Sequence, residues 1–253
     1  MVKRWVRRWT RRRAVHPRQL IFSGMVNFRD LGGLPADGGA VKTGVLYRSD
    51  SLAYATPADA KRLVERLGLA TVIDLRGQYE VENLGRGPLA DTPVAYVHAP
   101  IVDVSGADDL AGHYLAMLAE KGAVLAGMIK LLASADTLPA VFHCEAGCDR
   151  TGVLAAAVLS LLGVPDDAIA EDYALTAPAM PAIHARVRRV AEQLGLPTRP
   201  GVDLEWAPEA AMMAGALKMA RERWGGMREW AAEYGVSDDD VASLRSALID
   251  TRP

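Results

Sequence analysis

The chain has 253 residues, of which 50% are hydrophobic and 24% charged, a composition typical of a globular α/β-sized domain. Residues 1–18 hold eight Lys or Arg and no acid, so the rest carries 21 basic against 31 acidic residues, a net of −10. An acidic body argues against nucleic acid as a partner, and two cysteines four residues apart, Cys144 and Cys148, exclude a disulfide framework.

No secretory signal follows the basic start, because His16 and Pro17 stand where an apolar segment would be needed. The longest apolar run, residues 153–164, is shorter than the roughly 20 residues that span a bilayer. We therefore expect a cytoplasmic protein made of a basic tail, residues 1–18, and one domain, residues 19–253. The tail has two interpretations: it makes a peripheral membrane contact through an amphipathic helix, or it is a disordered basic arm or the product of a misassigned start codon.

The elements before the middle of the chain alternate between strands and helices. Turns and short strands are expected within residues 27–39, where Gly and Asp cluster. Thr56 and Pro57 are typical of a helix start, and Gly68 ends that helix after Leu67. The further strands are predicted at residues 45–49, 70–75, 94–98 and 138–142, and the further helices at 109–134 and 147–162.

This alternation predicts an α/β fold with a mostly parallel central sheet and helices on both faces. Functional groups in such sheets gather at the carboxyl ends of the strands, where Arg48, Asp74 and Cys144 would fall. Residues 166–252 show no convincing strand and are predicted to form a helical extension. Its helices are expected around residues 183–194, from 208 to 224, and at 241–249 after a capping box at 237–240.

The segment from His143 to Gly152 joins a predicted strand to a predicted helix through a loop that opens with Cys144 and closes with Arg150. The main-chain N–H groups of residues 145–150 can converge on one point, towards which the helix directs the positive end of its dipole. Gly147 permits the turn, and the Arg150 guanidinium can hold two oxygens of a phosphoryl group. The pattern predicts a site for a phosphate-like anion.

Cys144 lies at the floor of this loop, where a positive field favours the reactive thiolate over the thiol. The Thr151 hydroxyl can add a hydrogen bond to the sulfur. In-line attack of Cys144 on phosphorus would give a cysteinyl phosphate that water hydrolyses, with the loop amides and Arg150 stabilising the equatorial oxygens. We expect no metal and no other cofactor to be needed.

The pattern His-Cys-x5-Arg-Thr-Gly over residues 143–152 resembles the signature loop of the cysteine-based protein tyrosine phosphatase superfamily. Together with residues 27–33, 47–49 and 73–76, it is similar to the bacterial tyrosine phosphatase family that includes mycobacterial protein tyrosine phosphatase B. The resemblance implies a phosphatase fold in which helices within about residues 173–253 form a lid. It implies Cys144 as nucleophile and Arg150 as phosphate ligand.

Close relatives take their general acid from the residue before that arginine, which points to Asp149. Other phosphatases use a separate loop, for which Asp103 is the candidate here. Relatives usually have Lys where this chain has Cys148, and the loss of that charge weakens the expectation of phosphoinositide substrates. Cys148 is then either an inert small residue or a thiol that forms a disulfide with Cys144 on oxidation.

We expect a phosphomonoester hydrolase of broad or dual specificity that acts on phosphotyrosine proteins or on phosphorylated small molecules or lipids. The alternatives are a phosphoinositide phosphatase using the same site and a catalytically silent phosphate-binding module. Arg48 and Asp74 either touch substrate or belong to a buried ion-pair network behind the loop. The expected substrate contacts are the loop residues Glu145, Ala146, Gly147, Cys148, Asp149 and Arg150, with Arg48 and Asp74 beside them.

Overall fold

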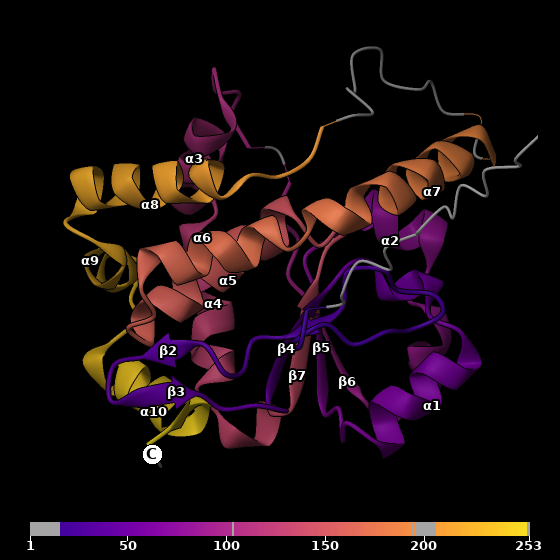
Figure 1. The fold of residues 1–253 in the computed structure, drawn as a ribbon, viewed down its shortest axis with the longest axis horizontal. Helices are drawn as coiled ribbons and strands as arrows, with labels where there is room; N and C mark the ends of the chain where they lie inside the picture. The colour runs from indigo at the N-terminus through magenta and orange to yellow at the C-terminus, as the bar shows by residue number, and fades with distance from the viewer. Residues whose placement is uncertain (1–15, 103, 194, 196–205, 252–253) are drawn as a thin grey trace, which may run out of the picture.

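The computed structural model describes residues 16–102, 104–193, 195 and 206–251. A five-stranded sheet runs through the centre of this part, in the order β1-β4-β7-β5-β6 (Figure 1). Four of its strands are parallel, and the edge strand β1 pairs antiparallel with β4. The strands of the sheet are β1 (Arg29–Asp30), β4 (Leu46–Ser49), β5 (Thr71–Asp74), β6 (Ala95–His98) and β7 (Ala140–His143). The predicted mostly parallel sheet is confirmed.

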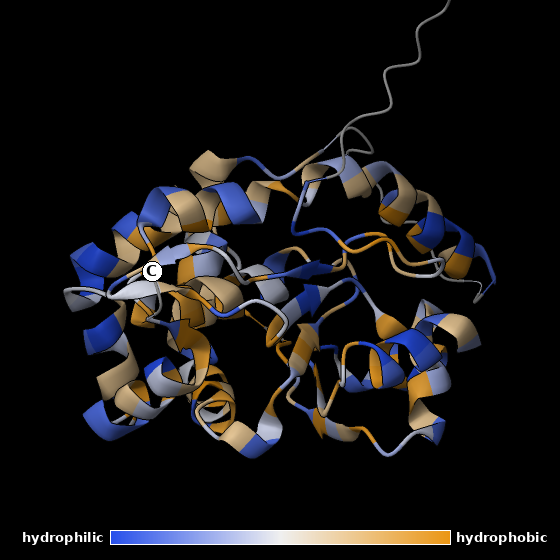
Figure 2. Ribbon diagram, turned by 60° about the horizontal axis from the view of Figure 1, so that its bottom comes forward, coloured by the Kyte–Doolittle hydropathy of each residue, from blue (hydrophilic) through white to orange (hydrophobic). Residues whose placement is uncertain are grey.

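Helices cover both faces of the sheet, as predicted, because alternate residues of its strands point to opposite sides. Ile73 and Phe142 pack into the larger core, with the helices of the second half of the chain. Val72 and Val141 face the smaller core, which is closed by the first helix and the N-terminal segment. Figure 2 shows the surrounding helices with hydrophobic stretches turned inward and hydrophilic ones at the periphery.

The first half of the chain forms the helices predicted for it, with one interruption, and a further helix over Gln78–Leu84 that was not predicted. Thr56 caps α1 by a reciprocal capping box with Asp59, and the helix ends two residues before the predicted Leu67. The stretch predicted as one helix over residues 109–134 is two helices that meet at Lys121. The helices of this half are α1 (Pro57–Glu65), α2 (Gln78–Leu84), α3 (Leu110–Glu120), α4 (Gly122–Leu132) and the short turns η1 (Leu52–Tyr54), η2 (Gly87–Asp91) and η3 (Ala135–Thr137).

The second half is helical after β7, and its first helix lies at the centre of the larger core. Residues 151–159 of α5 are all buried, so this helix is apolar around its whole circumference. One strand was missed in the region predicted to have none: β8 (Ile249–Asp250) closes a small antiparallel sheet with β2 (Pro35–Ala36) and β3 (Gly39–Val41). The helices are α5 (Asp149–Leu161), α6 (Asp166–Ala174), η4 (Ala177–Ala179), α7 (Met180–Gln193), α8 (Ala210–Trp224), α9 (Met227–Glu233) and α10 (Asp238–Leu248).

The N-terminal segment joins the folded body earlier than the predicted boundary after residue 18. Arg18 donates to the carboxylate of Asp172 in α6 at 2.6 Å, and Gln19 forms a bridge with Arg29. Residues 1–15, which hold most of the predicted basic tail, lie outside the described residues. Among the described helices, none has the length and apolar character that crossing a membrane requires.

Candidate active site

The loop of residues 144–148 leaves the carboxyl end of β7 and enters α5 at Asp149. Within the described chain, the N–H groups of residues 145–150 donate to no other residue, so they are free to bind an anion. Gly147 adopts a φ of +67°, and a Cβ at this position would lie 2.4 Å from the main-chain oxygen of Ser49. Both the backbone conformation and the space therefore require glycine at the turn of the loop.

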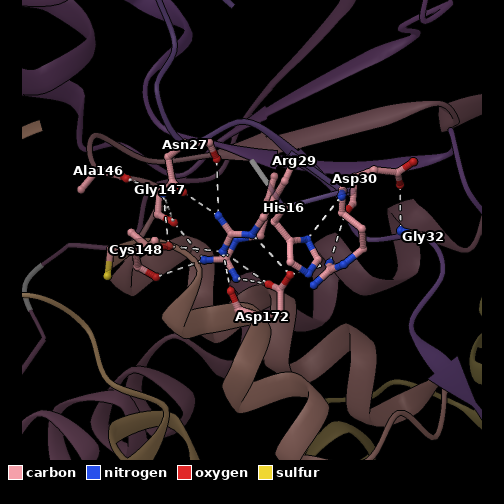
Figure 3. A network of polar contacts seen from close by, with 12 residues as sticks. His16, Asn27, Arg29, Asp30, Gly32, Ala146, Gly147, Cys148 and Asp172 are labelled. Atoms are coloured by element: carbon pink, nitrogen blue, oxygen red, sulfur yellow. Dashed lines mark hydrogen bonds and ion pairs between the residues drawn. The ribbon is translucent and has the colours of Figure 1, made fainter. Parts of the chain in front are cut away.

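Cys144 and Cys148 are both free thiols, and both are buried. Cys144 lies at the start of the loop, as predicted from its place after the strand. The sulfur of Cys148 points away from the arginines behind the loop (Figure 3) and is 3.7 Å from the hydroxyl of Tyr173. If Cys148 contacts an anion, it does so through its main-chain N–H. The buried Thr151 hydroxyl has no hydrogen-bond partner in the described chain, so the expected bond to the Cys144 sulfur is not formed here.

Arg150 closes the loop and is held by a carboxylate that the sequence analysis did not single out. Its Nη1 and Nη2 atoms donate to the two oxygens of Glu80 in α2 at 2.5 and 2.8 Å. Glu80 also accepts from the N–H of Gly77 at 2.7 Å, as the third residue of its helix. Burial raises the pKa of Glu80, but the Arg150 guanidinium outweighs this, and the pKa lies below its usual value. The bidentate pair fixes the plane in which Arg150 can present its remaining donors.

Asp149, beside Arg150, is partly buried at the first position of α5. Its Oδ1 accepts a hydrogen bond from the hydroxyl of Tyr114 in α3 at 2.5 Å. Tyr114 is also 2.6 Å from the hydroxyl of Tyr173 in α6. Asp103, the other carboxylate considered as an acid, lies outside the described residues.

A buried polar network supports the loop from behind (Figure 3). Asn27 donates to the main-chain oxygens of Ala146 and Gly147 at 3.1 and 3.3 Å, and Arg48 donates to that of Gly147 at 2.9 Å. Arg48 also pairs with Asp172 at 2.9 Å, so it holds the loop to α6. Its side chain is 1% exposed. The structure thus favours the ion-pair interpretation of Arg48 over contact with substrate.

Asp172 is the centre of that network. Its carboxylate accepts from Arg18, Arg29 and Arg48, and the side chain is fully buried. Burial raises the pKa of Asp172, but the three guanidinium groups outweigh it and hold the pKa far below its usual range. Burial and the neighbouring Arg48 lower the pKa of Arg29 to about 10. One negative charge therefore faces three positive ones directly behind the loop.

Asp74 belongs to a second buried cluster, beneath the other side of the loop. Its carboxylate pairs with Arg76 at 2.7 Å, accepts from Tyr96 at 3.0 Å and lies 3.7 Å from His143 Nε2. The other ring nitrogen of His143 is 3.2 Å from the main-chain oxygen of Cys144. Asp74, like Arg48, is thus occupied by protein partners. Among the described residues, no three His, Cys, Asp or Glu side chains are grouped to hold a metal ion.

Acid will weaken the fold through Asp74. Burial raises the pKa of Asp74, but His143 and Arg76 outweigh it and bring the value to about 2. Since the folded pKa is depressed, the stabilisation is present above pH 4 and is lost as the pH falls towards 2. We expect the unfolding free-energy difference between wild type and Asp74→Asn, measured by urea denaturation, to shrink by roughly 2 kcal/mol over that range. A difference that stays constant between pH 5 and pH 2 would contradict this.

Helix α7 lies over the loop and is anchored at its middle. Arg186 donates to Asp50 at 2.7 Å and stacks over the ring of Tyr54 at 4.0 Å. Met180 and Ile183 pack with Ala146 of the loop. Tyr54 in turn donates to the carboxylate of Glu145 at 2.7 Å, so α7 and the loop share this partner. Of the three arginines that the sequence places on this helix, Arg188 and Arg189 are exposed.

A description of the tyrosine phosphatase family matches residues 20–250. The triple specificity protein phosphatase PtpB of Mycobacterium tuberculosis is 26% identical over 281 aligned positions, covering 89% of this chain and 97% of that one. A protein of Cupriavidus necator named as a tyrosine-protein phosphatase is 36% identical over 174 positions, covering 61% of both chains. The core catalytic domain of the PP-IP phosphatase SIW14 from S. cerevisiae superposes with a TM-score of 0.40 at 17% identity, over 69% of this chain and 96% of that one.

Proposed function

The chain belongs to the tyrosine phosphatase family of cysteine-based phosphatases, and we propose that Cys144 is the nucleophile with which it hydrolyses phosphate monoesters. The observation that carries this proposal is the loop itself. The N–H groups of residues 145–150, which follow Cys144, have no acceptor within the described chain, and Arg150, just after the loop, is fixed by Glu80. A phosphoryl group bound there would meet a sulfur on one side and donors around its equator.

The proposed reaction has two steps. The Cys144 thiolate attacks phosphorus, the S–P bond forms, and the P–O bond to the leaving group breaks while Asp149 gives its proton to the leaving oxygen. Water then attacks phosphorus, the S–P bond breaks, and Asp149 takes the proton of the water, releasing inorganic phosphate. Asp149 is supported as the acid by its place beside Arg150 and by the hydrogen bond that orients it.

Phosphotyrosine proteins are the substrates we propose first, with broad specificity. The relative PtpB is named for triple specificity, which supports testing phosphoserine and lipid substrates as well. Cys148 argues against highly charged phosphoinositides, because its side chain is neutral and buried where the family resemblance leads us to expect a lysine. The anion must then be neutralised mainly by Arg150 and the loop amides.

The test is turnover of para-nitrophenyl phosphate by the wild type in EDTA, followed by a panel of phosphotyrosine peptides, phosphoserine peptides and phosphoinositide vesicles. Turnover that survives EDTA, with a phosphorylated Cys144 detected by mass spectrometry after rapid acid quenching, would support the proposal. Binding of phosphate without turnover would identify a silent binding module instead. Preference for the vesicles over every peptide would favour the phosphoinositide alternative.

Substituting Glu80 with glutamine will lower kcat/KM by about tenfold, because Arg150 loses its charged bidentate partner and the orientation that it fixes. The measurement is steady-state kinetics with a phosphotyrosine peptide. Glu82, exposed on the same helix, supplies the control: Glu82→Gln should leave kcat/KM within a factor of two. Equal effects of the two substitutions would show that the Arg150 pair does not matter to the site.

We further propose that the domain extends from His16 to the C-terminal region and that residues 1–15 add a peripheral contact with anionic membranes. The spacing of Val2, Trp5, Val6 and Trp9 among basic residues supports this. A deletion should stop at residue 15, because Arg18 pairs with Asp172 in the folded body. Sedimentation with phosphatidylserine vesicles that is unchanged by the deletion would exclude the contact.

A further inference from the structure

A continuous hydrogen-bonded chain of buried side chains ends at Asp149. Tyr114 donates to Asp149 Oδ1 at 2.5 Å, and the hydroxyls of Tyr114 and Tyr173 are 2.6 Å apart. The Cys148 thiol donates to the hydroxyl of Tyr173 at 3.7 Å. Tyr114, Tyr173 and Cys148 are at most 1% exposed. The two rings meet edge to face, with centroids 5.8 Å apart, so packing fixes the hydroxyls as well.

When Asp149 is ionised, the donors and acceptors in this hydrogen-bonded series follow from the chemistry of each group. A carboxylate only accepts, so the single hydroxyl proton of Tyr114 is directed to Asp149. The oxygen of Tyr114 must then accept from Tyr173, whose own oxygen is left to accept from Cys148. Tyr173 has one alternative acceptor, the weak sulfur of Met212, but at 3.9 Å it is much farther away than Tyr114. The resulting order runs from Cys148 through Tyr173 and Tyr114 to Asp149.

All three donors keep their protons at neutral pH. Burial is the largest cause that raises the pKa of Tyr114 and of Tyr173, and the nearby Asp149 raises both further. Burial likewise raises the pKa of the Cys148 thiol well above its usual value. A chain of neutral donors adds no charge beside the phosphate site, and it presents a fixed dipole to the carboxylate.

We infer that Tyr114 is a positioning residue for Asp149, and that Tyr173 and Cys148 fix the direction in which Tyr114 donates. The terminal torsion of an aspartate is soft, so its two oxygens exchange places easily unless one is held. With Oδ1 held by Tyr114, Oδ2 is the oxygen left to carry the proton to the leaving group. This inference rests on the proposed function, in which Asp149 is the general acid.

The hydrogen-bonded series also gives Cys148 a donor role that the loop motif does not reveal. Its thiol is turned into the core as the first donor, so it is more than a small residue that fills space. A serine at this position keeps one donor, whereas an alanine removes it. Cys148→Ser should therefore behave more like the wild type than Cys148→Ala does, with the difference confined to substrates that need a proton.

The experiment compares Tyr114→Phe on two aryl phosphates of similar size. Para-nitrophenolate leaves readily without a proton, whereas phenolate, like the tyrosine side chain with its pKa of about 10, needs one. We expect kcat/KM for phenyl phosphate to fall by about tenfold or more, and that for para-nitrophenyl phosphate by less than about threefold. Turnover of the second substrate by the same preparation reports that the variant is folded.

The matched control is Tyr234→Phe, which removes a hydroxyl that donates to Ala119 at 2.6 Å without touching this chain. Tyr234→Phe should leave kcat/KM unchanged for both aryl phosphates. A second control combines Tyr114→Phe with Asp149→Asn: once the carboxyl acid is gone, loss of the tyrosine hydroxyl should cost no further activity on phenyl phosphate.

Three results would overturn the positioning role. Tyr114→Phe could lower kcat/KM equally for both substrates, it could lower neither, or it could cause a further loss in the Asp149→Asn background. Failure of the proposed function looks different, because the wild type would then hydrolyse neither aryl phosphate. A selective loss on phenyl phosphate that disappears in the Asp149→Asn background is the result that supports the inference.

Discussion

Replacing Cys144 with serine will lower kcat for para-nitrophenyl phosphate by about 10⁴-fold or more, the scale on which enzymes lose activity with their nucleophile. A serine hydroxyl stays protonated where a thiol can ionise, so the variant lacks a comparably reactive nucleophile. The unpaired N–H groups and Arg150 are untouched by the change. The variant should therefore still bind a phosphotyrosine peptide, with a Kd within a few-fold of the wild-type KM.

Two measurements separate loss of chemistry from loss of structure. Isothermal titration calorimetry with the peptide reports the intact site, and stopped assays at high enzyme concentration report residual turnover. If Cys144→Ser keeps more than a tenth of the wild-type kcat, the nucleophile lies elsewhere. If it binds no peptide, the loop has collapsed and the kinetic loss has no mechanistic meaning.

Replacing Asp172 with asparagine will lower the free energy of unfolding by about 3–5 kcal/mol, the usual cost of leaving buried charge without its partner. Asparagine has nearly the same shape, but it removes the carboxylate that Arg18, Arg29 and Arg48 share. Two of these side chains are almost completely buried and have no route to water. The loop should loosen as well, because Arg48 ties Gly147 to this carboxylate.

Urea denaturation followed by fluorescence measures the effect, and the neighbouring Glu171 supplies the matched control. Glu171 is exposed on the same helix, so Glu171→Gln should change the unfolding free energy by less than about 0.5 kcal/mol. A loss below 1 kcal/mol for Asp172→Asn would mean that the three arginines are compensated by other groups.

The sequence was enough to predict the parts of the fold that rest on local patterns. Buried strands are recognisable as apolar runs, and the N-cap Thr56 with Pro57 and the loop after β7 each lie within a few consecutive residues. The strands β1 and β2 lie where short strands were expected, whereas the two-residue strand β8 is too short for any alternation to appear. The break at Lys121 within a continuous helical pattern likewise carries no strong local signal.

The partners of the loop could not be predicted from the sequence, for a different reason. Glu80 is 70 residues from Arg150, and Asp172 is 124 residues from Arg48. Tyr114, on a helix predicted only by its apolar pattern, reads as an ordinary core aromatic until the fold brings it against Asp149. Such pairs depend on tertiary packing, and a single sequence does not record it. Of these partners, Glu80 has a local sequence signal, because a glutamate three residues after Gly77 is typical of a helix start.

The three arginines around one buried aspartate have a consequence for how the site would respond to dissolved salt. Charges on a protein surface are screened by counter-ions within about 10 Å at 0.1 M ionic strength, but buried charges are screened much less. The excess positive charge behind Gly147 is of the buried kind. The acidic protein thus keeps, at this loop, an attraction for anions that dissolved salt screens only weakly, while its acidic surface repels anions less as salt is added.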